Sequence, residues 1–130
     1  MYIALDLGLK HVGIAISKSY VIATPYKNLY IMDNLYDELL TELKKLNQQN
    51  LIKKVFIGLP LHLDGQESEL SLYFREIKKK LENDFPHCQF ILVDERLTSK
   101  SAYKKKTFKQ RNDSLVAAEI LNYQLSKSNS

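Results

Sequence analysis

The chain has 130 residues and a formal net charge of +4 at pH 7, with 45% hydrophobic and 26% charged residues. This size and composition predict a single globular domain over residues 1–130. No apolar stretch is long enough to span a membrane and no signal-peptide pattern opens the chain, so we expect a cytoplasmic protein. The single cysteine, Cys88, excludes an internal disulfide and has no partner at zinc-ligand spacing.

The positive charge is concentrated near the C-terminus. Residues 1–95 carry 11 Lys and Arg against 13 Asp and Glu, whereas residues 96–130 carry 8 against 2. Such a segment attracts polyanions such as nucleic acid or an anionic membrane surface, although a solvated lysine-rich loop is the ordinary alternative. The basic residues concerned are Lys100, Lys104, Lys105, Lys106, Lys109 and Arg111.

The first half of the chain is predicted to contain three strands and a helix. The unbroken apolar run Tyr2–Leu5 is typical of a strand buried on both faces. Val12–Ser17 predicts a second strand, and the short gap between the two allows only an antiparallel hairpin. Tyr20–Thr24 predicts a third strand, ended by a proline. Leucines at helical spacing predict a helix over Asp33–Asn50, with its first residue as the cap.

The second half alternates strands and helices. The expected elements are a strand at Val55–Leu59, a helix at about Gln66–Asn83 with Leu70, Tyr73, Ile77 and Leu81 on its buried face, a strand at Gln89–Val93, and a helix at about Asp113–Leu125 that buries Ala117, Ala118, Leu121 and Leu125. Strands separated by helices pair in parallel through right-handed crossovers. The sequence therefore predicts an α/β domain with a five-stranded mixed sheet and helices on both faces.

Three carboxylates stand at the ends of separate elements that this topology brings together. Asp6 follows the first strand, Glu95 follows the last strand, and Asp113 opens the last helix. In such sheets, sites form beyond the carboxyl ends of the parallel strands. Crowded carboxylates repel one another without a counter-charge, and Mg²⁺ or Mn²⁺ supplies one. All three are therefore candidate metal ligands and catalytic residues of a two-metal site that hydrolyses phosphodiesters.

Each carboxylate also has a structural alternative. Asp6 could accept hydrogen bonds from the amides of a turn at 7–10. Glu95 could pair with Arg96 or with the lysines that follow it. Asp113 stands where an N-cap belongs, and a cap of this kind stabilises a helix by about 1 kcal/mol. Thr98 and Ser99 could donate to phosphate or cap a short helix.

Four motifs, in this order, resemble the YqgF family. They are Asp6-Leu7-Gly8-Leu9-Lys10-His11-Val12-Gly13-Ile14-Ala15, Gly58-Leu59-Pro60-Leu61 with Asp64-Gly65, Asp94-Glu95-Arg96-Leu97-Thr98-Ser99, and Asp113 followed by Ala117-Ala118 and Ile120-Leu121. Members of this family are bacterial proteins of the ribonuclease H-like superfamily, described as Holliday junction resolvases and as pre-16S rRNA nucleases. The likeness covers nearly the whole chain.

The resemblance implies a ribonuclease H-like sheet that opens with an antiparallel meander, and an acidic triad of Asp6, Glu95 and Asp113. In that arrangement Asp6 bridges two ions, and each of the other two carboxylates holds one. Lys10, Arg96, Thr98, Ser99 and the six basic residues named above are then candidate contacts to nucleic acid. Two departures from the family pattern are His11, where Arg is usual, and a short stretch between Ser99 and Asp113.

The resemblance favours an Mg²⁺- or Mn²⁺-dependent nuclease that processes the 5′ end of precursor 16S rRNA, with pre-30S ribosomal particles as a partner. A Holliday junction resolvase is the alternative within the same chemistry, and it needs a homodimer rather than a monomer. A non-catalytic RNA-binding factor in ribosome assembly is the alternative of another class.

Overall fold

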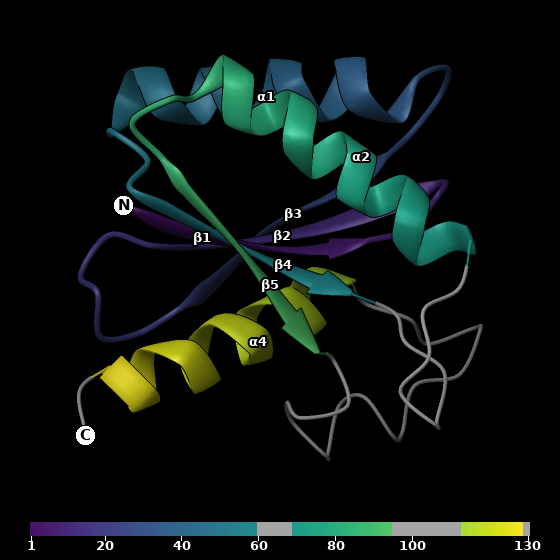
Figure 1. Ribbon diagram of the computed structural model, residues 1–130. Coiled ribbons are helices and arrows are strands. Elements are labelled where there is room, and N and C mark those ends of the chain that lie inside the picture. The colour runs from purple at the N-terminus through teal and green to yellow at the C-terminus, as the bar shows by residue number, and fades with distance from the viewer. Residues whose placement is uncertain (60–68, 95–112, 129–130) are drawn as a thin grey trace.

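The computed structural model in Figure 1 describes residues 1–59, 69–94 and 113–128. Its elements are β1 (Tyr2–Leu7), β2 (His11–Ser17), β3 (Thr24–Tyr30), α1 (Leu35–Gln49), β4 (Lys54–Leu59), α2 (Glu69–Asp84), β5 (Gln89–Asp94) and α4 (Asp113–Ser128). Their order is the one predicted from the sequence. No helix in these ranges is long and apolar enough to cross a membrane.

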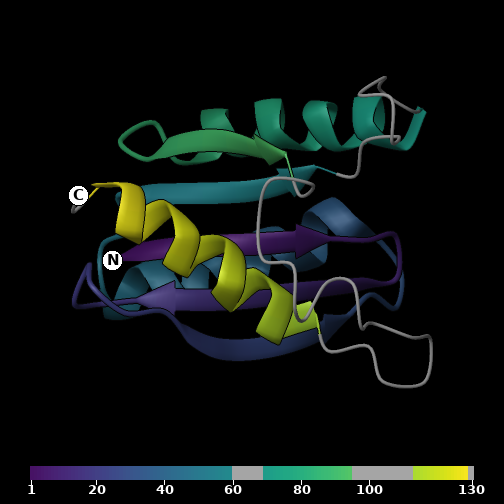
Figure 2. The same cartoon turned by 90° about the horizontal axis from the view of Figure 1, so that it is seen from below.

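The five strands form one mixed sheet in the order β3-β2-β1-β4-β5. β1 pairs antiparallel with β2, and β2 pairs antiparallel with β3, so the opening meander is confirmed. β4 pairs in parallel with β1 and with β5. Helices α1 and α2 cover one face of the sheet and α4 covers the other, as Figures 1 and 2 show. The predicted α/β fold is therefore confirmed.

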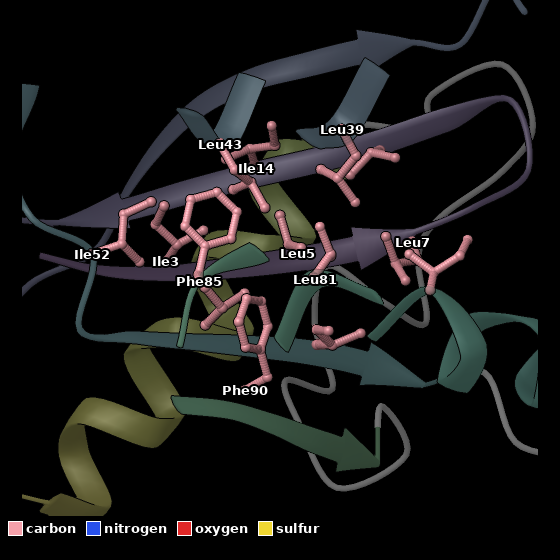
Figure 3. Packing of buried hydrophobic residues seen from close by; sticks show 14 of the residues in the cluster. Ile3, Leu5, Leu7, Ile14, Leu39, Leu43, Ile52, Leu81, Phe85 and Phe90 are labelled. Atoms are coloured by element: carbon pink, nitrogen blue, oxygen red, sulfur yellow. The ribbon is translucent and has the colours of Figure 1, made fainter. Parts of the chain in front are cut away.

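The core has one layer on each side of the sheet, because the side chains of β1 and β2 alternate between the two faces. The layer under α1 and α2 is built from large aliphatic and aromatic side chains (Figure 3), among them Ile3, Leu5, Ile14, Leu39, Leu43, Leu81, Phe85 and Phe90. On the opposite face Ala4 and Ala15 leave room for α4 to lie close to the strands. As predicted, α4 buries Ala117, Ala118, Leu121 and Leu125.

The position of β3 differs from the prediction. The apolar stretch before Pro25 is a surface connection, in which Val21 and Ile22 are 68% and 66% exposed, and the strand runs from Thr24 to Tyr30 instead. A proline is tolerated there because β3 is an edge strand, where a missing N–H breaks no interior pairing. A register shift between Ile14 and Ala15 marks the irregular pairing next to it.

Two smaller predictions about the helices are also wrong. The N-cap of α1 is Asn34 rather than Asp33, since the Asn34 side chain accepts a hydrogen bond from the N–H of Asp37 at 2.9 Å. On α2 the aromatic residue in the core is Phe74, fully buried, whereas Tyr73 is 41% exposed. Both errors are shifts of one residue, and neither changes which face of the helix packs on the sheet.

Candidate active site

The sequence predicted that Asp6 follows the first strand, but in the structure it lies inside β1. It is 2% exposed although it carries a carboxylate. Because Ala4 packs under α4 and side chains alternate along a strand, Asp6 faces α4 as well. Its position is one residue from the carboxyl end of β1, on the edge where the parallel strands end.

Asp6 is flanked on both sides by glycine. In the sheet it stands opposite Gly13 of β2 and opposite Gly58 of β4. The same row continues outward to Asn28 on β3 and to Val93 on β5. Since neither facing position carries a side chain, α4 can come close to the Asp6 carboxylate.

The first residue of α4 occupies part of that space. A Cβ atom added at Gly13 would lie 2.0 Å from the carbonyl carbon and oxygen of Asp113, and 2.6 Å from its Cβ. Real atoms do not approach so closely, so Asp113 can sit here only because residue 13 is glycine. Asp113 is 5% exposed. The fold therefore brings Asp113 against the residue that pairs with Asp6, although the two acids are far apart in the sequence.

The start of α4 is also held by Asn28. The backbone N–H of Ser114 donates a hydrogen bond to Asn28 Oδ1 over 2.7 Å. This bond satisfies one of the N–H groups that a helix N-terminus leaves without an intrahelical partner. Asn28 was missed from the sequence, because nothing at position 28 signals a partner 86 residues away. Gly13 did carry a signal, since glycine inside a strand often marks a close approach of another backbone.

Electrostatics favours negative charge at this point. The N-terminus of α4 carries the positive end of the helix dipole, which stabilises nearby carboxylates. Two neighbouring buried carboxylates also repel each other when both are ionised. The arrangement therefore suits a divalent cation bound by carboxylate oxygens, and hard cations such as Mg²⁺ prefer this donor type.

The other predicted site residues divide into two groups. Lys10 is exposed in the connection between β1 and β2, where its carbonyl oxygen accepts a hydrogen bond from Ile31 N–H at 2.9 Å. Glu95 follows β5 directly in the sequence but lies outside the described residues. So do Arg96, Thr98, Ser99 and the basic segment from Lys100 to Arg111. Two of the three predicted carboxylates are thus placed by the structure.

Comparison with known proteins gives a consistent result. Residues 1–127 match the model of the RuvX family, which is described as "Holliday junction resolvase". A protein of Aster yellows witches'-broom phytoplasma (strain AYWB) is 38% identical over 130 residues, which cover 92% of this chain and 84% of the relative. A protein of Sulfurihydrogenibium sp. (strain YO3AOP1) is 38% identical over 92% of this chain and 85% of the relative. A protein of Mycoplasmopsis pulmonis (strain UAB CTIP) is 34% identical over 95% and 90%. All three carry the name "Putative pre-16S rRNA nuclease".

Proposed function

The chain belongs to the RuvX family, the family that its motifs resemble, and we propose that it is a divalent-metal-dependent nuclease that processes the 5′ end of pre-16S rRNA. The observation that carries the proposal is the burial of Asp6 and Asp113 side by side at the carboxyl edge of the sheet. Two acids buried next to each other repel when both are ionised, and a divalent cation bound by their oxygens would offset that repulsion.

In this proposal Asp6, Asp113 and Glu95 hold Mg²⁺ or Mn²⁺. Asp6 is the central ligand, because it lies between two glycines and can be approached from both sides. When bound, the cations lower the pKa of a water molecule and offset negative charge on the leaving oxygen.

The protein's own groups then orient the substrate. The glycines beside Asp6 allow a phosphate to come close to the strand backbone. Lys10 and the basic residues after Glu95 hold neighbouring phosphates, so binding weakens as the salt concentration rises. Asn28 and Gly13 act by fixing the start of α4, and thereby the position of Asp113.

Cleavage assays with two substrates test the proposal. Purified protein is incubated with precursor 16S rRNA and with a four-way DNA junction, each with Mn²⁺ or with EDTA, and the ends are mapped. We expect Mn²⁺-dependent cutting near the 5′ end of the rRNA. Asp6→Asn abolishes this cutting, whereas Asp33→Asn, an exposed aspartate outside the site, leaves it unchanged. Cutting by a folded Asp6→Asn protein at the parent rate would contradict the proposal.

The family description supports a second candidate, a Holliday junction resolvase. Resolution needs two coordinated cuts and therefore two copies of the site. Paired, symmetric cuts in the junction, together with a dimer in gel filtration, would favour this candidate over rRNA processing. Salt-sensitive RNA binding without cutting of either substrate would indicate a non-catalytic assembly factor.

A further inference from the structure

The edge of the sheet opposite the carboxylates is rich in lysine and tyrosine. At this edge β1 and β4 begin, β2 runs into β3, and α4 ends, as Figure 2 shows. The segments that meet here are residues 1–2, 17–23, 50–54 and 122–128, and none of them contains an aspartate or a glutamate. They do contain Lys18, Lys53, Lys54 and Lys127. These segments at the edge are therefore positively charged.

Contacts join Lys54, Tyr2, Tyr20 and Lys53 into one cluster, and Lys18 lies on the same segment as Tyr20. Lys54 Nζ lies 5.3 Å from the ring centroid of Tyr2, and Lys53 Nζ lies 5.5 Å from that of Tyr20. The two tyrosine rings meet edge to face with their centroids 4.7 Å apart. Cation–π contacts of this kind hold ammonium groups over aromatic faces while leaving them accessible to a second charge. We call Lys18, Lys53, Lys54, Tyr2 and Tyr20 the amino-edge patch.

The loop that carries Tyr20 has a defined position. Tyr20 has a φ of 64°, and in the described part of the chain no other residue except glycine adopts a positive φ. Further along the loop, the backbone N–H of Ala23 donates to Asn122 Oδ1 of α4 at 2.9 Å. Beyond Asn122, Lys127 Nζ lies 5.5 Å from the ring centroid of Tyr123. The patch thus borders the C-terminal end of the helix whose N-terminus reaches the carboxylates.

We propose that the amino-edge patch binds the phosphate backbone of nucleic acid. The argument is charge complementarity. Lysines on segments that contain no acid attract a polyanion, and phosphate contacts supply most of the affinity of proteins for nucleic acid. Exposed Val21 and Ile22 border the patch and would suit a protein partner equally well, but they do not account for the lysines. The charge therefore decides in favour of nucleic acid.

The patch also sets a minimum size for the substrate, a step that rests on the proposed nuclease function. α4 has 16 residues and is therefore about 24 Å long at 1.5 Å per residue. A nucleic acid that contacts both ends of the helix must span that distance, roughly seven base pairs at the 3.4 Å rise of B-form DNA. The substrate class is then an extended or structured nucleic acid, and not a short oligonucleotide.

Equilibrium binding tests the patch without using the nuclease activity. A fluorescent RNA hairpin with a stem of about 20 base pairs is titrated in EDTA, so that no cleavage occurs, over a range of salt concentrations. We expect Lys53→Glu/Lys54→Glu to raise Kd about tenfold or more near 0.1 M salt. The slope of log K against log salt falls in magnitude by about 1.5, which corresponds to two lost phosphate contacts.

Lys44→Glu/Lys79→Glu is the matched control. It makes the same change in net charge at exposed lysines of α1 and α2, the helices that cover the face of the sheet opposite α4. We expect this variant to keep the parent slope, and circular dichroism confirms that both variants fold. Equal losses of affinity in the two double variants, or an unchanged slope in Lys53→Glu/Lys54→Glu, overturn the proposal. Since no metal is present, neither result depends on whether the protein is a nuclease.

Discussion

Gly13 is the residue on which the position of Asp113 depends most directly. In Gly13→Ala the new Cβ meets backbone atoms of Asp113 at 2.0 Å, and backbone cannot move aside as a flexible side chain can. We expect the start of α4 to shift and the free energy of unfolding to fall by about 3 kcal/mol, the upper part of the range for overpacking. Urea unfolding measures the loss. A free energy of unfolding equal to the parent's in Gly13→Ala would show that the start of α4 can shift without loss of stability.

The Asn28 side chain accepts a hydrogen bond from Ser114 N–H, and two substitutions test the importance of that bond. Asn28→Ala removes the acceptor and should cost about 1 kcal/mol, the usual value of a lost cap. Asn28→Asp keeps an acceptor oxygen and adds negative charge at a helix N-terminus, so it should recover most of the loss. Urea unfolding and the Mn²⁺ concentration at half-maximal cleavage are measured for both. Equal defects in the two variants would mean that the bond is not what matters.

Cys88 gives a prediction about pH, because burial raises the pKa of its thiol to about 11. The unfolded chain ionises this thiol near 9, so between these two values only the unfolded state loses the proton. Stability therefore falls as the pH rises from 9 to 11. The difference in absorbance at 240 nm between the parent and Cys88→Ser, in which the tyrosinate signal cancels, should have its midpoint near pH 11 in the folded protein. A midpoint near 9 in the folded state would contradict the prediction.

Between elements, one ion pair ties the edge strand β3 to α1. Lys27 Nζ lies 2.6 Å from Glu42 Oε1, and the Glu42 side chain is 4% exposed. Lys45 Nζ is 3.7 Å from the other carboxylate oxygen, too far for a good hydrogen bond. Without Lys27 the buried carboxylate therefore keeps only a distant partner, and buried charge without a close partner is unfavourable.

Lys27→Met should lower the free energy of unfolding by about 1 to 2 kcal/mol, less than for a fully buried pair because Lys27 is 42% exposed to solvent. The hydrogen bond to Glu42 raises the pKa of Lys27 above its usual 10.5. The contribution is thus complete below pH 10.5 and disappears as the pH rises through the folded-state value. Unfolding of parent and variant at pH 8 and pH 11 measures this, and a constant difference would contradict it. Lys27→Met/Glu42→Leu should recover the lost stability, since an apolar pair needs no counter-charge.

The elements also show which features a sequence can reveal. α1 was predictable because its leucines repeat at helical spacing and all pack on one side of the sheet. β3 was misplaced because its residues are largely exposed, so they carry no alternation, while the apolar residues Val21 and Ile22 next to it imitate a strand. For such an edge strand the pairing with β2 determines the structure, and local composition does not predict that pairing.

The site shows the same limit. Asp6 and Asp113 could be chosen as candidates because acids at the ends of elements stand out in an α/β pattern. The contacts that fix Asp113 were not predicted: Gly13 carries only a general signal of close backbone approach, and Asn28 carries none. Propensity and periodicity describe one segment at a time, whereas these contacts form only when β2, β3 and α4 pack together.

At the scale of the whole molecule, charge is divided between the two edges of the sheet. Carboxylates gather at the edge where the parallel strands end, and lysines with tyrosines gather where they begin. The hydrophobic layers on both faces provide the stability that allows acids to remain crowded at one edge. We therefore expect the acids at this edge to lower the free energy of unfolding of the metal-free protein, which can be measured.

Asp6→Asn should make the metal-free protein more stable, by about 1 kcal/mol, because it removes one of two adjacent buried charges and nearly preserves side-chain size. In the parent, Mn²⁺ at 100 times its Kd should raise the free energy of unfolding by about 2.7 kcal/mol, because only the folded state presents the site. Asp6→Asn should lose that increase. Thermal unfolding in EDTA and in Mn²⁺ measures both effects, with Asp33→Asn, an exposed aspartate, as the control that changes neither. A variant that is less stable than the parent in EDTA and still gains the full increase with Mn²⁺ would mean that Asp6 is a structural acid, and the cation would then have to bind elsewhere.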